Sequence, residues 1–399
     1  MASDPGVTES EVVLGQPAAF SGPSAGLGVE MWRGAEAAFA EANAKGGVHG
    51  RKVRLVVADD RYDAEKAVAA VSHLLSQEHV FALFGGVGTP TIVKVLPLVL
   101  REHRANGLFY FANFTGAQAQ REPPYAEAVF NVRASYRAET AAMVEAFVAM
   151  GRKSIGIFVQ DDAYGASGRA GVRAALEEKH LALAADTSYP RGQAYAVSTG
   201  TQVAALRQAK VDAIISVGSY QACAALIRDA RNAGWLVPIH NVSFVGADQM
   251  LALLTADEQQ HVPLTQNLIV TQIVPSYQDA NFPLVRDYRA AIDRFHPTRP
   301  AGVGDGSYQP KDPYSFGSLE GYLSARVFLL VLERAGKDLT RQAFYRAAEG
   351  MGSFDVGLKV PAEFSPARHQ ALDSVWFTTP TKLGWTTTRY PARTLVPDK

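Results

Sequence analysis

VVLGQPAAF at residues 12–20 and VRLVVAD at residues 53–59 are short apolar runs that flank GVEMWRGAEAAFAEAN at residues 28–43. The two outer runs are typical of buried strands, and the middle segment carries its apolar residues at helical spacing. Two strands joined by one helix form a βαβ unit, which requires a parallel sheet covered on both faces. This stretch therefore predicts an α/β fold.

The same alternation continues along the chain. Further strands are expected at residues 80–86, 108–113, 154–160, 213–218, 239–245 and 268–274, and helices at residues 64–75, 91–103, 164–179, 195–209, 220–233, 284–295 and 318–335. The cycle restarts after residues 130–133, which predicts two α/β lobes. Residues 296–314 are rich in Pro, Gly, Asp and Ser and predict a long loop, and short β segments such as 374–378 are expected in the tail.

The composition excludes several classes of protein. The chain has 399 residues, of which 47% are hydrophobic and 20% charged, so disorder is excluded as the dominant state. Its 39 Lys and Arg balance 39 Asp and Glu, which disfavours a nucleic-acid partner and a polybasic membrane surface. The start, MASDPG, lacks the basic and apolar regions of a secretory leader, so a signal sequence is absent from this sequence whether or not the protein is exported.

Metal and thiol chemistry are not predicted. The single Cys223 lies among Ala and Leu at helical spacing, which favours a buried, inert thiol. The nine His are scattered and have no Cys partner, so a zinc site is improbable. The acid pairs Asp59-Asp60 and Asp161-Asp162 each follow a strand, where capping of a loop is favoured over acid/base or metal chemistry. We expect no cofactor.

Two turns between a strand and a helix are candidate sites. GPSAG at residues 22–26 matches the Gly-x-Ser-x-Gly pattern of a hydrolase with Ser24 as nucleophile, but only one strand precedes it. A helix-start turn that faces a ligand, or that simply caps the helix, is favoured instead. FGGVGTPT at residues 84–91 lacks a dinucleotide motif and a Walker lysine. Its helix amides and the Thr89 and Thr91 hydroxyls suit a carboxylate, while capping alone has about even odds.

Several blocks together resemble the type I periplasmic solute-binding proteins of ABC importers, in the branched-chain amino acid (Leu/Ile/Val) class. The blocks are FSGPSAGLG at 20–28, EANAKGGVHGRKV at 41–53, ADD at 58–60, FNVR at 130–133, QDDAYG at 160–165 and IRDARNAG at 227–234. The resemblance implies two Rossmann-like lobes joined by three crossover strands, with a ligand cleft between them. Lobe 1 would hold residues 10–133 and 271–352, and lobe 2 residues 134–270 and 353–399.

The resemblance also implies ligand-binding residues. A carboxylate subsite falls on Gly88 and Thr89 together with Asn113, Phe114 and Thr115. The other implied contacts are Ser24, Leu27, Tyr164, Ser219, Tyr220, Ser243 and Phe244. Arg133 would add either a charged donor or a structural salt bridge, and Tyr314 and Phe316 could extend an aromatic wall.

One departure from the family pattern concerns the ligand. Amino-acid binders use an acid to hold the ligand's ammonium, and it would lie near residues 242–244, where no acid stands. Because an unpaired buried ammonium is costly, we expect a carboxylate ligand that lacks a charged amine, such as an aromatic or aliphatic acid.

The resemblance implies a non-catalytic, extracytoplasmic protein, periplasmic or lipid-anchored, that hands a small molecule to ABC permease subunits. We expect a monomer without a nucleic-acid partner. The alternatives are a ligand-sensing receptor domain of the same fold, an amino acid binder proper, and, more remotely, an α/β hydrolase using Ser24.

Overall fold

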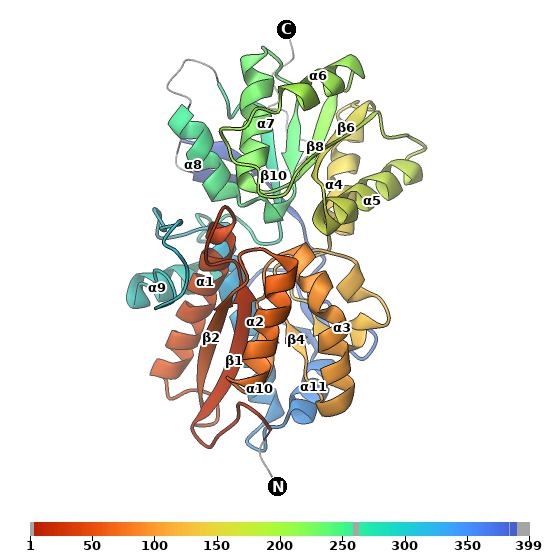
Figure 1. Ribbon diagram of the computed structural model, residues 1–399. Helices are drawn as coiled ribbons and strands as arrows, with labels where there is room; N and C mark the ends of the chain where they lie inside the picture. Colours follow the sequence, from red (N-terminus) through yellow and green to blue (C-terminus); the bar gives the residue numbers. More distant parts are fainter. Residues whose placement is uncertain (1–3, 258–262, 383, 389–399) are drawn as a thin grey trace. The chain divides into compact units, whose positions relative to one another are not determined.

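The computed structural model describes residues 4–257, 263–382 and 384–388. The chain divides into two compact units (Figure 1). Unit 1 contains residues 1–134 and 279–374, and unit 2 contains residues 135–278 and 375–399, so the chain passes between them three times. The second and third boundaries come later than the expected 270/271 and 352/353. The reason is that residues 268–272 pair within the sheet of unit 2, whereas residues 352–364 form a hairpin in unit 1.

Unit 1 is built on a five-stranded parallel sheet. Its strands follow the order β2-β1-β3-β4-β5, with the bounds β1 (Glu11–Ala18), β2 (Lys52–Asp59), β3 (Ala82–Phe84), β4 (Tyr110–Phe111) and β5 (Val129–Phe130). The helices are α1 (Ala25–Ala44), α2 (Ala64–Ser76), α3 (Thr89–Asn106), α9 (Pro283–Phe295), α10 (Phe316–Ala335) and α11 (Arg341–Glu349). Two 3₁₀ turns, η1 (Ala119–Arg121) and η2 (Tyr125–Ala128), and a hairpin of β11 (Gly352–Phe354) and β12 (Ala362–Phe364) complete it.

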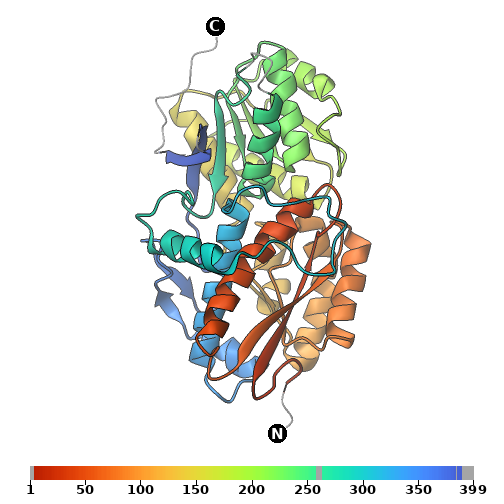
Figure 2. The same cartoon turned by 90° about the vertical axis from the view of Figure 1, so that its left-hand side faces the viewer.

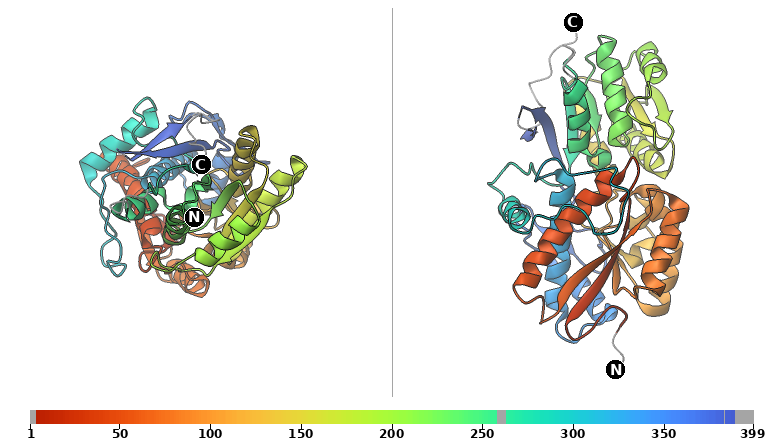
Figure 3. Two further views of the ribbon diagram at one scale, coloured as in Figure 1. Left: turned by 90° about the horizontal axis from the view of Figure 1, so that it is seen from above. Right: turned by 60° about the vertical axis from the view of Figure 1, so that its left-hand side comes forward.

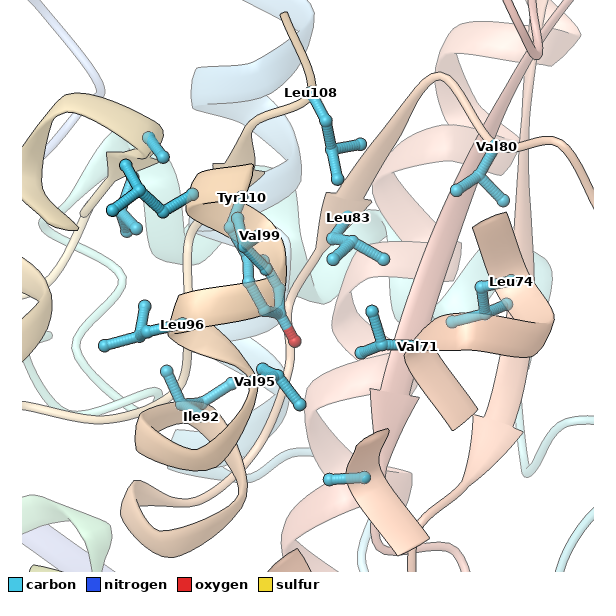
Figure 4. Packing of buried hydrophobic residues seen from close by; sticks show 14 of the residues in the cluster. Val71, Leu74, Val80, Leu83, Ile92, Val95, Leu96, Val99, Leu108 and Tyr110 are labelled. Carbon is cyan, nitrogen blue, oxygen red and sulfur yellow. The ribbon is translucent and has the colours of Figure 1, made fainter. Parts of the chain in front are cut away.

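One face of this sheet is covered by α2 and α3. Figure 4 shows the apolar side chains between them, with Val71 and Leu74 from α2, Val95 and Val99 from α3, and Leu83 from β3. These side chains are fully or almost fully buried. The next strand residues in sequence point to the opposite face, where α10 packs and where phenylalanines gather: Phe39, Phe84, Phe111, Phe328 and Phe344.

Helices α1 and α10 pack unusually closely. A methyl group on Gly34 would lie 1.6 Å from the Ser318 carbonyl oxygen, and one on Gly321 would lie 2.1 Å from the Met31 carbonyl oxygen. The two glycines therefore let the backbones approach at a distance that no larger residue permits. Figure 3 shows α1 and α10 in two further views.

Unit 2 is built on a seven-stranded sheet in the order β14-β13-β10-β9-β8-β6-β7. Its strands are β6 (Ile155–Gln160), β7 (Ala185–Tyr189), β8 (Ala213–Val217), β9 (Ile239–Asn241), β10 (Leu268–Gln272), β13 (Trp376–Thr381) and β14 (Gly384–Thr388), the last two antiparallel. The helices are α4 (Tyr136–Ala149), α5 (Ala163–Glu178), α6 (Gly200–Gln208), α7 (Tyr220–Asn232) and α8 (Ala247–Asp257), with one 3₁₀ turn, η3 (Ser243–Val245).

The α/β fold with parallel sheets is confirmed, but several elements differ from the sequence predictions. The expected helix at 195–209 begins only at Gly200. The expected strand at 239–245 ends at Asn241, and η3 follows it at Ser243. The sequence patterns did not predict α4, β7, α8 or α11. Residues 296–314 form a loop without helix or strand, as expected.

This loop is fastened to unit 1 at its base and at its tip. The Arg33 guanidinium on α1 donates to the carbonyl oxygens of Pro297, Asp312 and Pro313. At the tip, the Gly22 amide donates to the Asp305 carboxylate at 3.2 Å. Figure 2 shows the segment that leaves α9 and crosses α1.

Candidate functional site

The carboxyl ends of β3 and β4 bring one group of predicted residues together in unit 1. Val87 bridges Phe114, and the Phe114 amide donates to the Gly86 carbonyl oxygen at 2.7 Å. Gly88 then turns the chain into α3 with a φ of 106°, and a side chain on it would lie 2.2 Å from the Tyr62 ring. Glycine is therefore required at this turn for both its conformation and its lack of a side chain.

The turn places the hydroxyl groups of Thr89 and Thr115 next to each other. Their Oγ1 atoms are 2.6 Å apart, and both residues are about 1% exposed or less. One hydroxyl donates to the other, so the pair keeps one hydrogen for a further acceptor at the N-terminus of α3, where the helix dipole favours an anion. Thr91 is different, because its hydroxyl already donates to the carbonyl oxygens of Val87 and Gly88.

Asn113 and Phe114 lie beside this pair in the sequence. Asn113 is 1% exposed, and its side-chain oxygen and nitrogen find no hydrogen-bond partner among the described residues. A buried amide of this kind costs free energy unless a bound group satisfies it. Five predicted residues thus come from one strand end and one helix start: Gly88, Thr89, Asn113, Phe114 and Thr115.

Arg133 has the structural role that the sequence left open. Its guanidinium lies 3.3 Å from the Glu320 carboxylate, and both side chains are buried. The guanidinium also lies over the Phe114 ring, 5.1 Å from the centroid. Arg133 therefore packs against a predicted site residue while its charge is balanced within unit 1.

Ser24 and Leu27 form the start of α1. Ser24 directly precedes the helix, its carbonyl oxygen accepts the Leu27 amide at 3.0 Å, and both side chains are buried. Within the described parts of the chain, the Ser24 hydroxyl makes no hydrogen bond to a histidine or carboxylate that would activate it as a nucleophile. In the described residues, no hydrogen bond joins Ser24 or Leu27 to the Thr89–Thr115 pair.

The Tyr314 hydroxyl donates to the Asp293 carboxylate at 2.6 Å, and the Arg289 guanidinium lies over the Tyr314 ring. Phe316 is buried in the first turn of α10.

Unit 2 brings a second group of predicted residues together. Tyr164, at the start of α5, lies between Tyr136 and Phe244, with ring centroids 5.2 and 5.0 Å away. Its hydroxyl donates to the Gly218 carbonyl oxygen at 3.4 Å, immediately before Ser219 and Tyr220 at the start of α7. The three rings are fully buried, and Tyr136 was not predicted because it lies on the unpredicted helix α4.

The structure corrects the expectation that no acid lies near residues 242–244. Glu139, on α4, accepts hydrogen bonds from the Ser243 amide at 2.8 Å, the Ser243 hydroxyl at 2.9 Å and the Thr271 hydroxyl at 2.6 Å. Glu139 is fully buried. Its position depends on the packing of α4 against a segment 104 residues later, so no local sequence signal reports it.

One acid of each pair caps a loop or a helix start, the role that the sequence favoured. Asp59 accepts the Phe20 and Arg61 amides and the Ser21 hydroxyl, and Asp162 accepts the Tyr164 amide at the start of α5. Among the described residues, no cluster of His, Cys, Asp and Glu is arranged to hold a metal ion.

Asp60 is an exceptional carboxyl group. It is 1% exposed, and burial, with smaller contributions from Asp59 and Asp63, raises its pKa to about 8. An unfolded Asp has a pKa near 3.9. Between these values the folded state keeps a proton that the unfolded state releases, so this group's contribution to stability falls as pH rises from about 4 to 8.

Asp60→Asn is therefore expected to be about as stable as the native chain at pH 4 and more stable than it by about 5 kcal/mol at pH 8. Thermal unfolding at a series of pH values measures the difference. A difference that stays constant with pH would contradict the assignment to Asp60.

Cys223 is inert, as predicted. It is fully buried on α7, burial raises the pKa of its thiol to about 12, and the Ser216 hydroxyl donates to its Sγ at 3.1 Å. A neutral, inaccessible thiol is not a nucleophile.

Comparison with known proteins identifies the family. The sequence model described as "Periplasmic binding protein" matches residues 11–383, which is most of the chain. The chain belongs to the periplasmic binding protein family. Proteins of this family are extracytoplasmic substrate-binding proteins, and the Leu/Ile/Val-binding class within it agrees with the sequence blocks. No helix in the described residues is long and apolar enough to cross a membrane.

Two relatives and one further structure of the same fold are similar to this chain. "Leu/Ile/Val-binding protein homolog 7" of Brucella melitensis is 29% identical over 82% of this chain and 77% of its own. The crystal structure of a possible leucine/isoleucine/valine-binding protein from Rhodopirellula baltica is 33% identical, with a TM-score of 0.85 over 97% of this chain and 98% of its own. A fatty acid ABC transporter substrate-binding protein from Thermomonospora curvata is 23% identical, with a TM-score of 0.80 over 100% and 95%, which shows the shared fold.

Proposed function

We propose that this protein is the solute receptor of an ABC importer and binds a small organic carboxylate that lacks a charged amine. The observation that carries the carboxylate is the Thr89–Thr115 hydroxyl pair at the N-terminus of α3, next to the unsatisfied amide of Asn113. These groups offer hydrogen-bond donors and a favourable dipole to an anion. The family membership supports delivery to permease subunits from the periplasm or from a lipid anchor.

The rest of the ligand is proposed to be apolar or aromatic. Tyr136, Tyr164 and Phe244 in unit 2 form an aromatic cluster of the kind that lines small-molecule sites. The Glu139 carboxylate has roughly four acceptor positions, and three protein donors already use three of them. This carboxylate is therefore poorly placed to bind a ligand ammonium as well, which favours a ligand without one.

A branched-chain amino acid is the second candidate. Two relatives carry leucine, isoleucine and valine in their names, and Glu139 supplies the acid that residues 242–244 lack. The fatty acid receptor of the same fold favours the first candidate. The difference between the two candidates is the charged amine.

Calorimetry with matched ligands separates them. We would titrate the protein with leucine, valine, isovalerate and benzoate, after a thermal-shift screen in which a ligand at about 100 times its Kd adds about 2.7 kcal/mol. Binding of the acids without the amine supports the proposal. Tight binding of leucine or valine, with none of benzoate or isovalerate, would overturn the ligand class and leave the receptor role intact.

Thr89→Val tests the carboxylate subsite. Loss of the hydroxyl removes a hydrogen bond to a charged group, so the affinity for the acid is expected to fall about 10- to 100-fold. The matched control is Thr255→Val on α8, where an exposed hydroxyl donates to the Leu251 carbonyl oxygen. Equal affinities for the two variants would place the carboxylate elsewhere.

A further inference from the structure

A cavity of about 520 Å³ lies in unit 1, and none of its lining residues is a proposed ligand residue. It follows β2, the edge strand of the sheet, and is walled by α1 and by the loop after α9. The lining residues used below are Trp32, Glu36, Leu55, Val57, Ala301 and Val303.

The backbone of β2 shows which of its groups face this cavity. The Lys52 amide donates to the Ser10 carbonyl oxygen, and the Asp60 amide donates to the Ala18 carbonyl oxygen. The backbone amide and carbonyl groups of even-numbered β2 residues therefore face β1. The amide and carbonyl groups of Val53 instead bond the Asn43 side chain at 2.8 Å each, outside the sheet. Alternation along a strand therefore directs the amide and carbonyl groups of Leu55 and Val57 outward.

On the described strand β2, the Asn43 side chain forms hydrogen bonds with the outward backbone groups of Val53 only. For the outward groups of Leu55 and Val57, the described residues supply no partner, and β1 is the one described strand that pairs with β2. An unpaired row of amides and carbonyls is a template for another extended chain. The side chains of these two residues point toward α1, since Val56 and Ala58 pack on the opposite face against the α2–α3 cluster.

The walls of the cavity limit its occupant. Trp32 and the half-buried Glu36 come from α1, and burial raises the pKa of Glu36, which has no ion pair among the described residues. On the other side, Ala301 and Val303 belong to the loop that Arg33 and Asp305 fasten in place. The loop therefore forms a fixed wall on this side of the cavity.

We propose that the β2 edge binds an extended peptide segment of a partner protein, which pairs with Leu55 and Val57 and places a basic side chain against Glu36. Main-chain hydrogen bonds supply the affinity, and the Glu36 carboxylate supplies the preference for a cation. This surface shares no residue with the proposed solute site, and the proposal does not depend on the identity of the solute.

Amide hydrogen exchange with a defined peptide tests this pairing. The probe is acetyl-Val-Lys-Val-Lys-Val-amide, and its controls are the same peptide with alternate backbone nitrogens methylated and an analogue with Glu in place of Lys. Saturation with the basic peptide should slow exchange at the Leu55 and Val57 amides about tenfold or more, at affinities near the millimolar range or tighter. Equal binding of the methylated peptide, or no slowing at about 5 mM, would overturn the proposal.

Two variants identify the walls. Glu36→Gln is expected to weaken the basic peptide about three- to tenfold, whereas Glu65→Gln, at an exposed ion pair with Lys94 on α2, should leave it unchanged. Ala301→Trp fills the cavity and should abolish the protection of both amides. An unchanged affinity in Glu36→Gln would overturn the basic preference. If both amides were protected without peptide and sedimentation showed a dimer, the occupant of the edge would be a second copy of this chain and the peptide proposal would be wrong.

Discussion

Gly34→Ala is expected to destabilise unit 1 by about 3 kcal/mol or more and to lower its thermal midpoint by about 6–12 °C. The added methyl would lie 1.6 Å from the Ser318 carbonyl oxygen and 2.7 Å from the Tyr322 nitrogen. Because both atoms belong to the backbone of α10, no side-chain rotation relieves the overlap. The two helices must move apart, and this movement disturbs the apolar core beneath them. Differential scanning calorimetry measures the shift.

The matched control is Gly200→Ala at the first residue of α6. A methyl there meets only the flexible Ser198 hydroxyl at 3.3 Å, and the position does not require a positive φ. We expect its midpoint to stay within about 2 °C of the native value. A similarly small shift in Gly34→Ala would show that α1 and α10 are not in such close contact.

Glu139→Ala is expected to destabilise unit 2 by about 3–5 kcal/mol. The substitution leaves the Ser243 amide and the hydroxyls of Ser243 and Thr271 without their acceptor in a fully buried place. It also detaches α4 from the segment that carries Phe244. Chemical denaturation followed by circular dichroism measures the loss, with unit 1 as an internal reference if the two units unfold separately.

Glu145→Ala on the same helix is the control for this substitution. Glu145 is exposed, so the change is expected to stay within about 0.5 kcal/mol. If the two alanine variants were equally stable, the hydrogen bonds of Glu139 would not hold η3 against α4.

The sequence predicted those features that depend on local patterns. Apolar runs of strand length located β1, β2, β6 and β8, and the Asp-Asp pairs were assigned to caps because they follow strands. The grouping of Gly88 and Thr89 with Asn113 to Thr115 followed from the resemblance and the shared edge of parallel strands. The strand predictions need only the periods of helices and strands, whereas the grouping of the subsite residues needed the resemblance.

Features that depend on packing between distant segments were missed. Glu139 meets Ser243 because α4, which has a weakly amphipathic pattern, packs beside β9 and β10. The pairing of β10 with β13 joins residues more than one hundred positions apart and moved the boundary of unit 2. The outward direction of the Leu55 and Val57 backbone groups was inferred from the hydrogen bonds between Asn43 and Val53, a contact that the sequence pattern does not report.

Because β13 and β14 lie near the C-terminal end of the sequence, they affect the order in which the two units can fold during synthesis. Residues 376–388 complete the sheet of unit 2, yet residues 279–374 of unit 1 are made before them. Until then β10 is an open edge, and α10 and α11, which cover the aromatic face of unit 1, are also made late. Neither unit can complete its native packing until these late segments are made, so apolar surface and an unpaired strand edge stay accessible until translation nears its end.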